Sequence, residues 1–361
     1  MSVPQRMTRR LSVHETQQAA MLLRAGGLVA LPTETVYGLA ADVRLPAAID
    51  AVFDAKERPA SDPLIVHLSH HLLGEDIARG LVSTGWARDG QWRGAVEALS
   101  AAAWPGPLTV VLPRGPRATD RITATGPSVA VRIPAHGATL SVLDALGDAV
   151  VAPSANRFGR ISPTSADAVL TELDGRIDAV LDGGPCTIGV ESTVITLVDT
   201  PAVLRPGAFD ATLLAAWIGA PVATHAAPAS ATPHASPGLL DRHYAPRTRV
   251  IRLAARETWE PGASPPLGRF AWLCWSSPDE RVWPWSSACT TLCLCPDGDV
   301  AGAARRLYAT MRDLDEACFD ALFVEVPPDG PGLLTALNDR LRRASSSTPI
   351  LRPTLDGLLP V

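Results

Sequence analysis

The order of apolar and polar residues predicts a chain in which strands and helices alternate. Short runs rich in Val, Leu and Ile recur between longer segments whose apolar residues return every three or four positions. Their irregular spacing predicts a mixed α/β sheet rather than a strictly repeating βαβ array. In the first part of the chain we expect strands at 28–31, 64–68, 108–112, 129–133, 149–152, 179–181 and 193–198, and helices at 15–25, 46–55, 94–103, 139–146, 165–173 and 211–217.

The second part of the chain has a more regular pattern. Strand-like and helical runs alternate over roughly 25–30 residues, which predicts a small, open, Rossmann-like α/β sheet. Between the two parts, residues 211–240 contain no charged residue, and 221–237 have the Ala, Pro, Thr and Ser composition of a semi-extended linker. We therefore expect a first domain at 12–215, a linker at 216–247 and a second domain at 248–361. The expected elements of the second domain are strands at 249–253, 270–275, 290–295 and 321–326, and helices at 300–312 and 332–343.

Composition excludes several classes of protein. With 47% hydrophobic and 19% charged residues, the 361-residue chain can bury sizeable cores and is not of the disordered type. No apolar run approaches the ~18 residues of a membrane span, and the arginines near the start are not followed by the apolar stretch of a secretory signal. Six cysteines without paired ligand spacing predict a reduced, cytoplasmic setting. The formal net charge of -5 argues against a protein that coats nucleic acid.

One lysine stands out. Of the 32 basic residues only Lys56 is a lysine. Codon bias explains why lysines are rare but not why this one is retained, and a compact ammonium suits contact with a phosphate. Arg58 lies two positions on, and Pro59 favours an extended backbone before it, so both cations are expected to point the same way. The pair predicts a polyphosphate contact, and the alternative is a solvated helix end with its cations at the C-terminus.

Further polar residues follow other predicted strands, which is where function is often found. Thr35 belongs to a Pro-Thr-Glu-Thr segment that is also compatible with a structural turn capping a helix. Arg132 lies in an apolar strand and needs an anion, either a protein carboxylate or a substrate carboxylate. His67 ends an apolar strand, where a histidine is usually structural, and Arg205 alone fits a solvated loop. The remaining candidates are Ser128, Ser154, Asn156, Thr164 and Ser192.

The order of these motifs resembles a known family. Lys56-x-Arg58-Pro59, Ser154-x-Asn156 and Ser192-Thr-Val, each beside an apolar strand, are similar to the YrdC-like family, the threonylcarbamoyl-AMP synthases. Residues 236–246 resemble the Ser-Pro-Gly…His-Tyr-Ala-Pro linker of its long, two-domain members. The resemblance extends over about residues 15–247. The rest of the chain matches only as a small α/β domain of the expected size and place.

The resemblance implies a fold and an activity. The expected fold is a twisted mixed sheet with a large concave cavity, followed by a linker and a small Rossmann-like domain. The expected activity is that of a cytoplasmic nucleotidyltransferase, which condenses L-threonine, bicarbonate or CO2, and ATP into threonylcarbamoyl-AMP and pyrophosphate. This is the first step of the N6-threonylcarbamoyladenosine modification of tRNA. Magnesium would accompany ATP, without a prosthetic group or protein metal ligands. The implied partners are proteins that transfer the group to tRNA, and direct RNA binding is left open.

The resemblance also assigns roles to residues. Lys56 and Arg58 would be the catalytic cations. Tyr244, in the linker, would close over ATP as part of a lid. The family often has Asn where this chain has Asp62, a carboxylate that Lys56, Arg58 or magnesium would have to neutralise beside phosphates. The implied ATP site is Lys56, Arg58, Asp62, Ser128, Asn156, Thr164, Arg205 and Tyr244, and the implied threonine site is Thr35, His67, Arg132, Ser154 and Ser192.

Two other functions remain as alternatives. A double-stranded RNA-binding module would need many cations against the phosphate backbone, which the net negative charge disfavours. A protein that forms a carbamoyl adenylate without threonine specificity, as in hydrogenase maturation, would resemble larger assemblies with an acylphosphatase-like domain and zinc-finger cysteines. Neither feature is found in the sequence.

Overall fold

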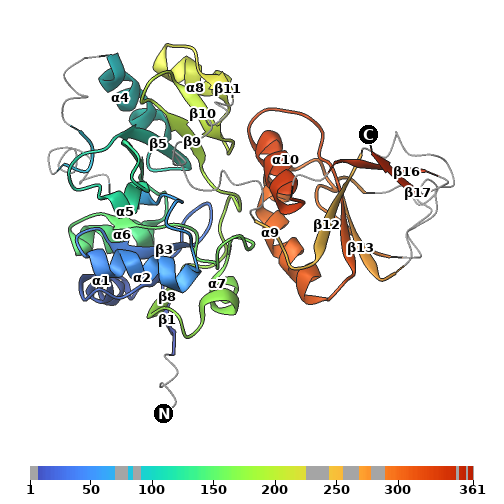
Figure 1. Ribbon diagram of the computed structural model, residues 1–361, viewed down its shortest axis with the longest axis horizontal. Coiled ribbons are helices and arrows are strands. Elements are labelled where there is room, and N and C mark those ends of the chain that lie inside the picture. Colours follow the sequence, from blue (N-terminus) through green and yellow to red (C-terminus); the bar gives the residue numbers. More distant parts are fainter. Residues whose placement is uncertain are drawn as a thin grey trace. The chain divides into compact units, whose positions relative to one another are not determined.

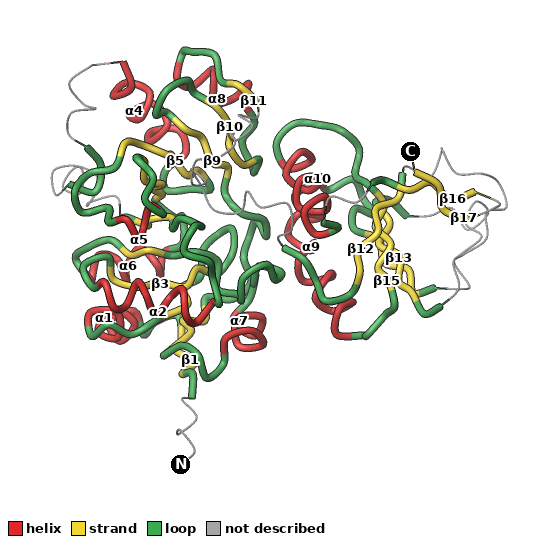
Figure 2. The backbone as a smooth tube through the Cα atoms, viewed as in Figure 1, coloured by secondary structure: helices red, strands yellow, loops and turns green. Residues whose placement is uncertain are grey.

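The chain forms two compact units in a computed structural model (Figures 1 and 2). The structure describes residues 7–69, 80–83, 91–224, 244–254, 268–277, 289–346, 349–354 and 357–360. The first unit comprises Met1–Phe158, Ser162–Thr187 and Glu191–Leu239, and the second comprises Gly159–Ile161, Ile188–Val190 and Leu240–Val361.

The first unit is built on a mixed sheet. Its described strands number eleven, in the order β1-β8-β2-β3-β7-β4-β6-β5-β9-β10-β11. Helix α1 packs against α6, and α4 packs against α8. The strands are β1 (Arg9–Ser12), β2 (Val29–Leu31), β3 (Gly38–Asp42), β4 (Ile65–His67), β5 (Leu108–Pro113), β6 (Ser128–Arg132), β7 (Val150–Val151), β8 (Ala179–Asp182), β9 (Thr193–Thr196), β10 (Ala202–Arg205) and β11 (Ala223–Thr224). The helices are α1 (Thr16–Arg24), α2 (Pro46–Lys56), α4 (Gln91–Ala103), α5 (Asp120–Thr123), α6 (Gly137–Leu146), α7 (Ala166–Leu173) and α8 (Ala211–Ile218).

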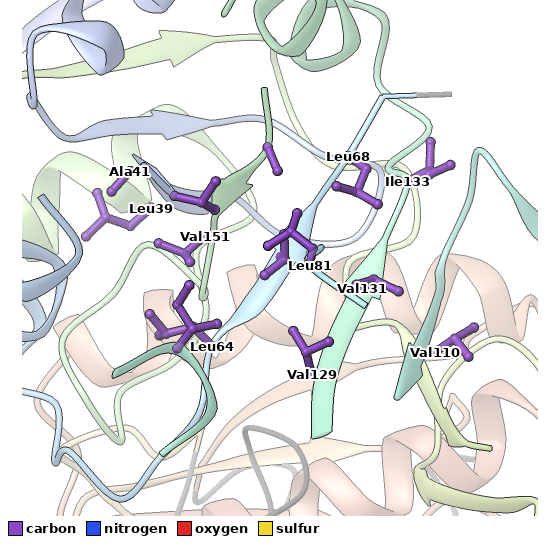
Figure 3. Close-up of a cluster of buried hydrophobic side chains, with 14 of the residues drawn as sticks. Leu39, Ala41, Leu64, Leu68, Leu81, Val110, Val129, Val131, Ile133 and Val151 are labelled. Carbon is purple, nitrogen blue, oxygen red and sulfur yellow. The ribbon is translucent and has the colours of Figure 1, made fainter. Parts of the chain in front are cut away.

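Alternation along the central strands directs side chains to two faces of the sheet, and both faces carry apolar clusters. Val129, Val131 and Ile133 of the β6 segment belong to the main apolar core, which Figure 3 shows together with residues of β3, β5 and β7 and with Leu64 and Leu68, which flank β4. Side chains of successive strand residues point to opposite faces, so Arg132 lies on the face away from this core. Arg132 and His67, at the ends of β6 and β4, are therefore buried polar residues on the face opposite the main core.

Helix boundaries follow local sequence signals. Pro46 occupies the first turn of α2, where its missing N–H costs no hydrogen bond, and Glu57 ends the helix in a left-handed conformation with φ 55°. The hydroxyl of Ser165 accepts a hydrogen bond from the N–H of Ala168 (3.3 Å) and caps α7, as its sequence predicts. These boundaries place Lys56 at the end of α2.

The second unit contains a smaller sheet with helices beside it. Its described strands have the order β14-β13-β15-β12-β16-β17, and all neighbours are parallel except β16 and β17. Figure 1 shows the two helices on one side of this sheet. The elements are β12 (Arg249–Leu253), β13 (Phe270–Cys274), β14 (Thr290–Cys293), β15 (Ala321–Glu325), β16 (Leu351–Thr354), β17 (Gly357–Pro360), α9 (Val300–Glu316) and α10 (Leu333–Ala344).

Every strand and helix predicted above is present in the structure, with ends that differ by at most four residues. The elements that were missed lack a strong pattern. Strand β3 has no β-branched residue although all five of its residues are buried, and β1 is mostly exposed. Strand β11 falls inside the predicted linker and pairs with β10, whereas residues 225–243 lie outside the described residues. The predicted domain boundaries therefore stay predictions.

Replacing a fully buried core leucine tests the packing of the first unit. Leu39 has 0% exposure, so Leu39→Ala should lower the free energy of unfolding by about 2–5 kcal/mol because it leaves a cavity. Met21 is 57% exposed, and Met21→Ala should change that free energy by no more than about 0.5 kcal/mol. Urea unfolding of both variants measures the difference, and equal effects would contradict the described core.

Candidate active site

Lys56 is a buried cation that binds a loop of the same unit. It is 1% exposed, and its Nζ donates hydrogen bonds to the carbonyl oxygens of Ser154 and Asn156, the latter at 2.6 Å. Burial, and next the charge of Arg58, lower the pKa of Lys56 well below its usual value. The expected extended backbone is wrong, because Lys56 is the last residue of α2 and Glu57 has φ 55°. The solvated helix end is wrong as well, because the ammonium is enclosed.

Arg58 neutralises the unusual carboxylate of Asp62. The Nη2 atom of Arg58 lies 2.9 Å from Oδ2 of Asp62, and both side chains are buried. The same guanidinium donates to the carbonyl oxygens of Asp62 (3.2 Å) and Pro63 (2.7 Å). Of the three groups expected to offset the Asp62 charge, the structure shows Arg58 doing so.

Arg132 has a protein carboxylate as its anion. Its Nη2 lies 2.6 Å from Oε1 of Glu34, and the two residues are 4% and 6% exposed. The other oxygen of Glu34 accepts the N–H of Ala135 at 2.9 Å, and Nε of Arg132 donates to the carbonyl of Gly106 at 3.2 Å. Of the two anions considered from the sequence, the protein carboxylate is present here. The geometry fixes the plane of the guanidinium.

His67 lies beside Arg132, since the two residues are register partners on β4 and β6. Burial, and next the charge of Arg132, lower the pKa of His67 to about 3, so the imidazole is neutral at neutral pH. Among the described residues, its Nδ1 and the hydroxyl of buried Ser69 have no hydrogen-bond partner. Buried polar atoms are normally paired, so these two are suited to a polar ligand.

The Thr35 segment is a turn tied to the Ser154 loop. Thr33 Oγ1 accepts the N–H of Thr35 at 3.1 Å, and the two threonine hydroxyls lie 2.9 Å apart. The segment leads into β3, so the helix-capping interpretation is wrong. Gly38 makes a backbone bridge with Ser154, and a Cβ at Gly38 would lie 3.1 Å from that of Ala152. A larger residue at position 38 would therefore require Ala152 to move by a few tenths of an ångström.

A third group joins Ser192 to Arg205. Arg205 ends β10 and is 4% exposed, so the solvated-loop interpretation is wrong. Its Nη2 donates to the hydroxyl of Ser192 at 3.0 Å and its Nε to the Ser192 carbonyl at 3.1 Å. The Ser192 hydroxyl also lies 2.8 Å from that of Thr109. Ser192 was predicted for threonine and Arg205 for phosphate, and the two are in direct contact.

The remaining predicted site residues lie on three different segments of the chain. Thr164 is buried before α7, and its carbonyl accepts the N–H of Cys186 at 2.9 Å. Ser128 begins β6, at the end opposite Arg132. Tyr244 belongs to the second unit, where it is 1% exposed.

Several polar residues in these groups were not predicted from the sequence. Besides Glu34 and Ser69 they include Thr109 and Glu191, whose Oε1 accepts the hydroxyl proton of Ser162 at 2.6 Å. Glu34 and Glu191 are adjacent in sequence to the predicted site residues Thr35 and Ser192, and this adjacency is the one sequence signal that pointed to them. Within the described ranges, no group of three His, Cys, Asp or Glu residues is placed to bind a metal ion. In the same ranges, no helix is both long and apolar enough to span a membrane.

Comparisons with known proteins match both parts of the chain. The Sua5, YciO and YrdC family model, described as Telomere recombination, matches residues 21–207, and one described as Threonylcarbamoyl-AMP synthase, C-terminal domain, matches 208–346. A threonylcarbamoyl-AMP synthase of Bacillus subtilis (strain 168) is 35% identical over 354 residues, covering 94% of this chain and 96% of the relative. Another, from Pyrococcus abyssi (strain GE5 / Orsay), is 41% identical over 236 residues, covering 64% and 66%.

A solved structure agrees with these matches. P. abyssi Sua5 complexed with L-threonine matches with a TM-score of 0.79 and 32% identity, over 94% of this chain and 98% of that chain. The YrdC-like mixed sheet followed by a second α/β unit is therefore confirmed. Fold, buried cations and relatives together define the class as enzymes of the transferase type that form an adenylate. Within that class, the chain belongs to the Sua5/YciO/YrdC family, in the form that carries the synthase C-terminal domain.

The pKa of His67 gives a test of the site's burial. Because that pKa is about 3, below the ordinary 6.5, the unfolded chain binds a proton between these pH values and the folded chain does not. Stability from this group is therefore complete above pH 6.5 and decreases as the pH falls toward 3. The imidazole C2–H resonance of His67, assigned with His67→Gln, should not shift between pH 8 and about pH 5.

Protonation of the His67 imidazole should also be detectable in unfolding measurements. Lowering the pH from 6.5 to about 4 should decrease the free energy of unfolding of the wild type by about 2 to 3 kcal/mol more than that of His67→Gln. An NMR titration midpoint near 6.5, with equal pH slopes for both proteins, would show that the imidazole is solvated.

Proposed function

We propose that this protein is a threonylcarbamoyl-AMP synthase, a nucleotidyltransferase that makes threonylcarbamoyl-AMP and pyrophosphate from L-threonine, bicarbonate or CO2, and ATP. The observation that carries the proposal is the match to a threonylcarbamoyl-AMP synthase along 94% of the chain. Buried cations such as Lys56 and Arg132 support it, because all three reactants carry or gain negative charge. The Nδ1 atom of His67 and the hydroxyl of Ser69, which have no hydrogen-bond partner among the described residues, could contact a polar substrate.

The chemistry has two steps. The threonine amine adds to the carbon of CO2 and loses a proton, giving a carbamate. A carbamate oxygen then attacks the α-phosphorus of ATP, and the bond to pyrophosphate breaks. Neither step needs a covalent bond to the enzyme. The protein contributes by bringing the reactants together and by stabilising negative charge.

Lys56, Arg58 and Arg205 are the proposed phosphate ligands, with Lys56 and Arg58 acting in catalysis. An ammonium has three donors, and Lys56 uses two on the carbonyls of Ser154 and Asn156, which leaves one for a phosphate oxygen. The paired Asp62 carboxylate would then shape the site without a net repulsion. Ser128, Asn156 and Thr164 are proposed to complete the nucleotide site.

Arg132 is the proposed partner of the threonine carboxylate. A guanidinium has five N–H donors, and Glu34 and Gly106 account for two of those on Arg132. His67 next to it is neutral, so its Nδ1 can contact the substrate without adding charge. Thr35, Ser154 and Ser192 are proposed to enclose the rest of the amino acid.

Magnesium is proposed to enter with ATP. The Asp62 carboxylate is paired with Arg58, which fits a magnesium ion that is carried by phosphate oxygens. When bound, the ion would offset phosphate charge. We further propose that the protein acts in the cytoplasm with proteins that transfer the threonylcarbamoyl group to tRNA, and that Tyr244 closes over ATP.

Pyrophosphate release tests the proposal directly. Release from ATP should require both L-threonine and bicarbonate, and Lys56→Ala should lower its rate about 100-fold or more because a charge beside the phosphates is lost. Lys56→Met retains the apolar stem and should lose activity equally. The matched control is Arg93→Ala, whose side chain is 68% exposed and which should behave as the wild type.

Other results of the pyrophosphate assay would favour one of the alternative functions. Release that does not depend on threonine would assign a carbamoyl adenylate without threonine specificity. A folded protein that releases no pyrophosphate, and that binds double-stranded RNA in a salt-dependent manner, would be an RNA-binding module.

A further inference from the structure

Thr109 lies in a row of residues that crosses four neighbouring strands of the first unit. It is the second residue of β5, and it pairs in register with Val194 of β9. The antiparallel register of β5 with β6 brings Thr109 level with Arg132, and Arg132 pairs with His67 of β4. Residues opposite each other on paired strands share a face of the sheet. Thr109 therefore lies on the same face as two residues that are proposed to bind the amino-acid substrate.

An unpaired polar atom on this face indicates that a ligand binds there. His67 is 3% exposed, and its Nδ1 has no hydrogen-bond partner among the described residues. A buried polar atom without a partner is costly unless a ligand completes it. Ser192 directly precedes β9, and its hydroxyl oxygen lies 2.8 Å from that of Thr109. The hydroxyl pair thus lies on this face, two strands from an atom that a bound ligand would satisfy.

Counting protons and lone pairs fixes the direction of the contact between Thr109 and Ser192. A hydroxyl has one proton to donate and two lone pairs that accept. Both residues have 0% exposure, and within the described part of the chain Thr109 Oγ1 has no hydrogen-bond partner other than Ser192 Oγ. The Thr109 proton is therefore satisfied only if it is donated to Ser192.

Arg205 supplies a second donor to the same serine oxygen. A guanidinium can only donate, and Nη2 of Arg205 lies 3.0 Å from Ser192 Oγ. The two donors fill the lone pairs of Ser192, and among the described residues its own proton has no acceptor left. Ser192 is thus restricted to donating toward a ligand. A substrate ammonium, which also donates, does not fit this position, whereas a negatively charged oxygen fits it well.

We propose that Thr109 is a positioning residue for the synthase reaction, which directs the Ser192 proton toward an anionic oxygen of the amino-acid substrate. The inference rests on the proposed function, in which Arg132 binds the threonine carboxylate and Arg205 binds phosphate. In the strand order β6-β5-β9-β10, Ser192 at the start of β9 lies between those two arginines. Two groups of the substrate have the required chemistry: the carboxylate of threonine and the carbamate that forms on its amine.

Steady-state kinetics test this role. Thr109→Val retains the shape of the side chain without its hydroxyl, so it should lower kcat/KM for L-threonine about tenfold and leave the KM for ATP within about twofold. Thr109→Ser retains the hydroxyl and should stay within about threefold of the wild type. Thr109→Val combined with Ser192→Ala should be no worse than Ser192→Ala alone, because Thr109 acts through Ser192. Thr171→Val, the same change at an exposed position of α7, should have no effect.

Calorimetric titration with L-threonine, in the absence of bicarbonate and ATP, identifies the oxygen that accepts. If Ser192 donates to the carboxylate, Thr109→Val should weaken this binding about tenfold. If it donates to the carbamate, the binding should be unchanged, because the carbamate forms only from CO2, and the loss should appear in turnover. Thermal unfolding of each variant checks that the fold is intact.

The outcomes distinguish this inference from the proposed function. A wild type without threonine-dependent pyrophosphate release would overturn both. The positioning role alone is wrong if Thr109→Val behaves as the wild type, or if it raises the KM for ATP as much as that for L-threonine. A folded Thr109→Ser protein that loses as much activity as Thr109→Val would also overturn it, since the hydroxyl would then not be the cause. In these cases the synthase assignment stands.

Discussion

The buried ammonium of Lys56 is the contact on which the arrangement of the first unit depends. A buried charge is unfavourable unless strong partners surround it, and here two backbone carbonyls of the loop at Ser154 and Asn156 supply them. The contact joins the end of α2 to a loop that follows β7, about one hundred residues away in sequence. That loop in turn bridges to Gly38 and so to the turn containing Thr35. One side chain thereby sets the distance between two groups of polar residues.

The arginines of the first unit follow the same principle with different partners. Arg58 binds Asp62, Arg132 binds Glu34, and each guanidinium is fixed in direction before any substrate is present. An arginine whose fork is already oriented loses less freedom when an anion binds. The protein carboxylates also prevent a cluster of cations from repelling itself. Preorganisation of this kind suits a reaction that depends on placing charged reactants rather than on a nucleophile of the enzyme.

Secondary-structure elements could be predicted from the sequence, whereas most side-chain contacts could not. Apolar periodicity is local, so β6 and α2 could be located from a few neighbouring residues, and the order of the motifs indicated the family. Partners such as Glu34 for Arg132 are distant in sequence, and no local pattern encodes their pairing. The extended backbone expected at Lys56 failed because a left-handed Glu57, which ends the helix, is rarely foreseen outside glycine and asparagine. Strand β3 was missed because burial, not β-propensity, forms it.

The charge balance of these groups connects the fold with its proposed chemistry. Arg58 and Arg132 are each paired with a carboxylate, Asp62 and Glu34, whereas the ammonium of Lys56 is bound by two backbone carbonyls. A buried ammonium that is bound by neutral carbonyls still has a desolvation cost, which an anion beside it would reduce. In the proposed function, the phosphates of ATP would supply that anion. Burial, and next the charge of Arg58, lower the pKa of Lys56, and a bound anion would act in the opposite direction.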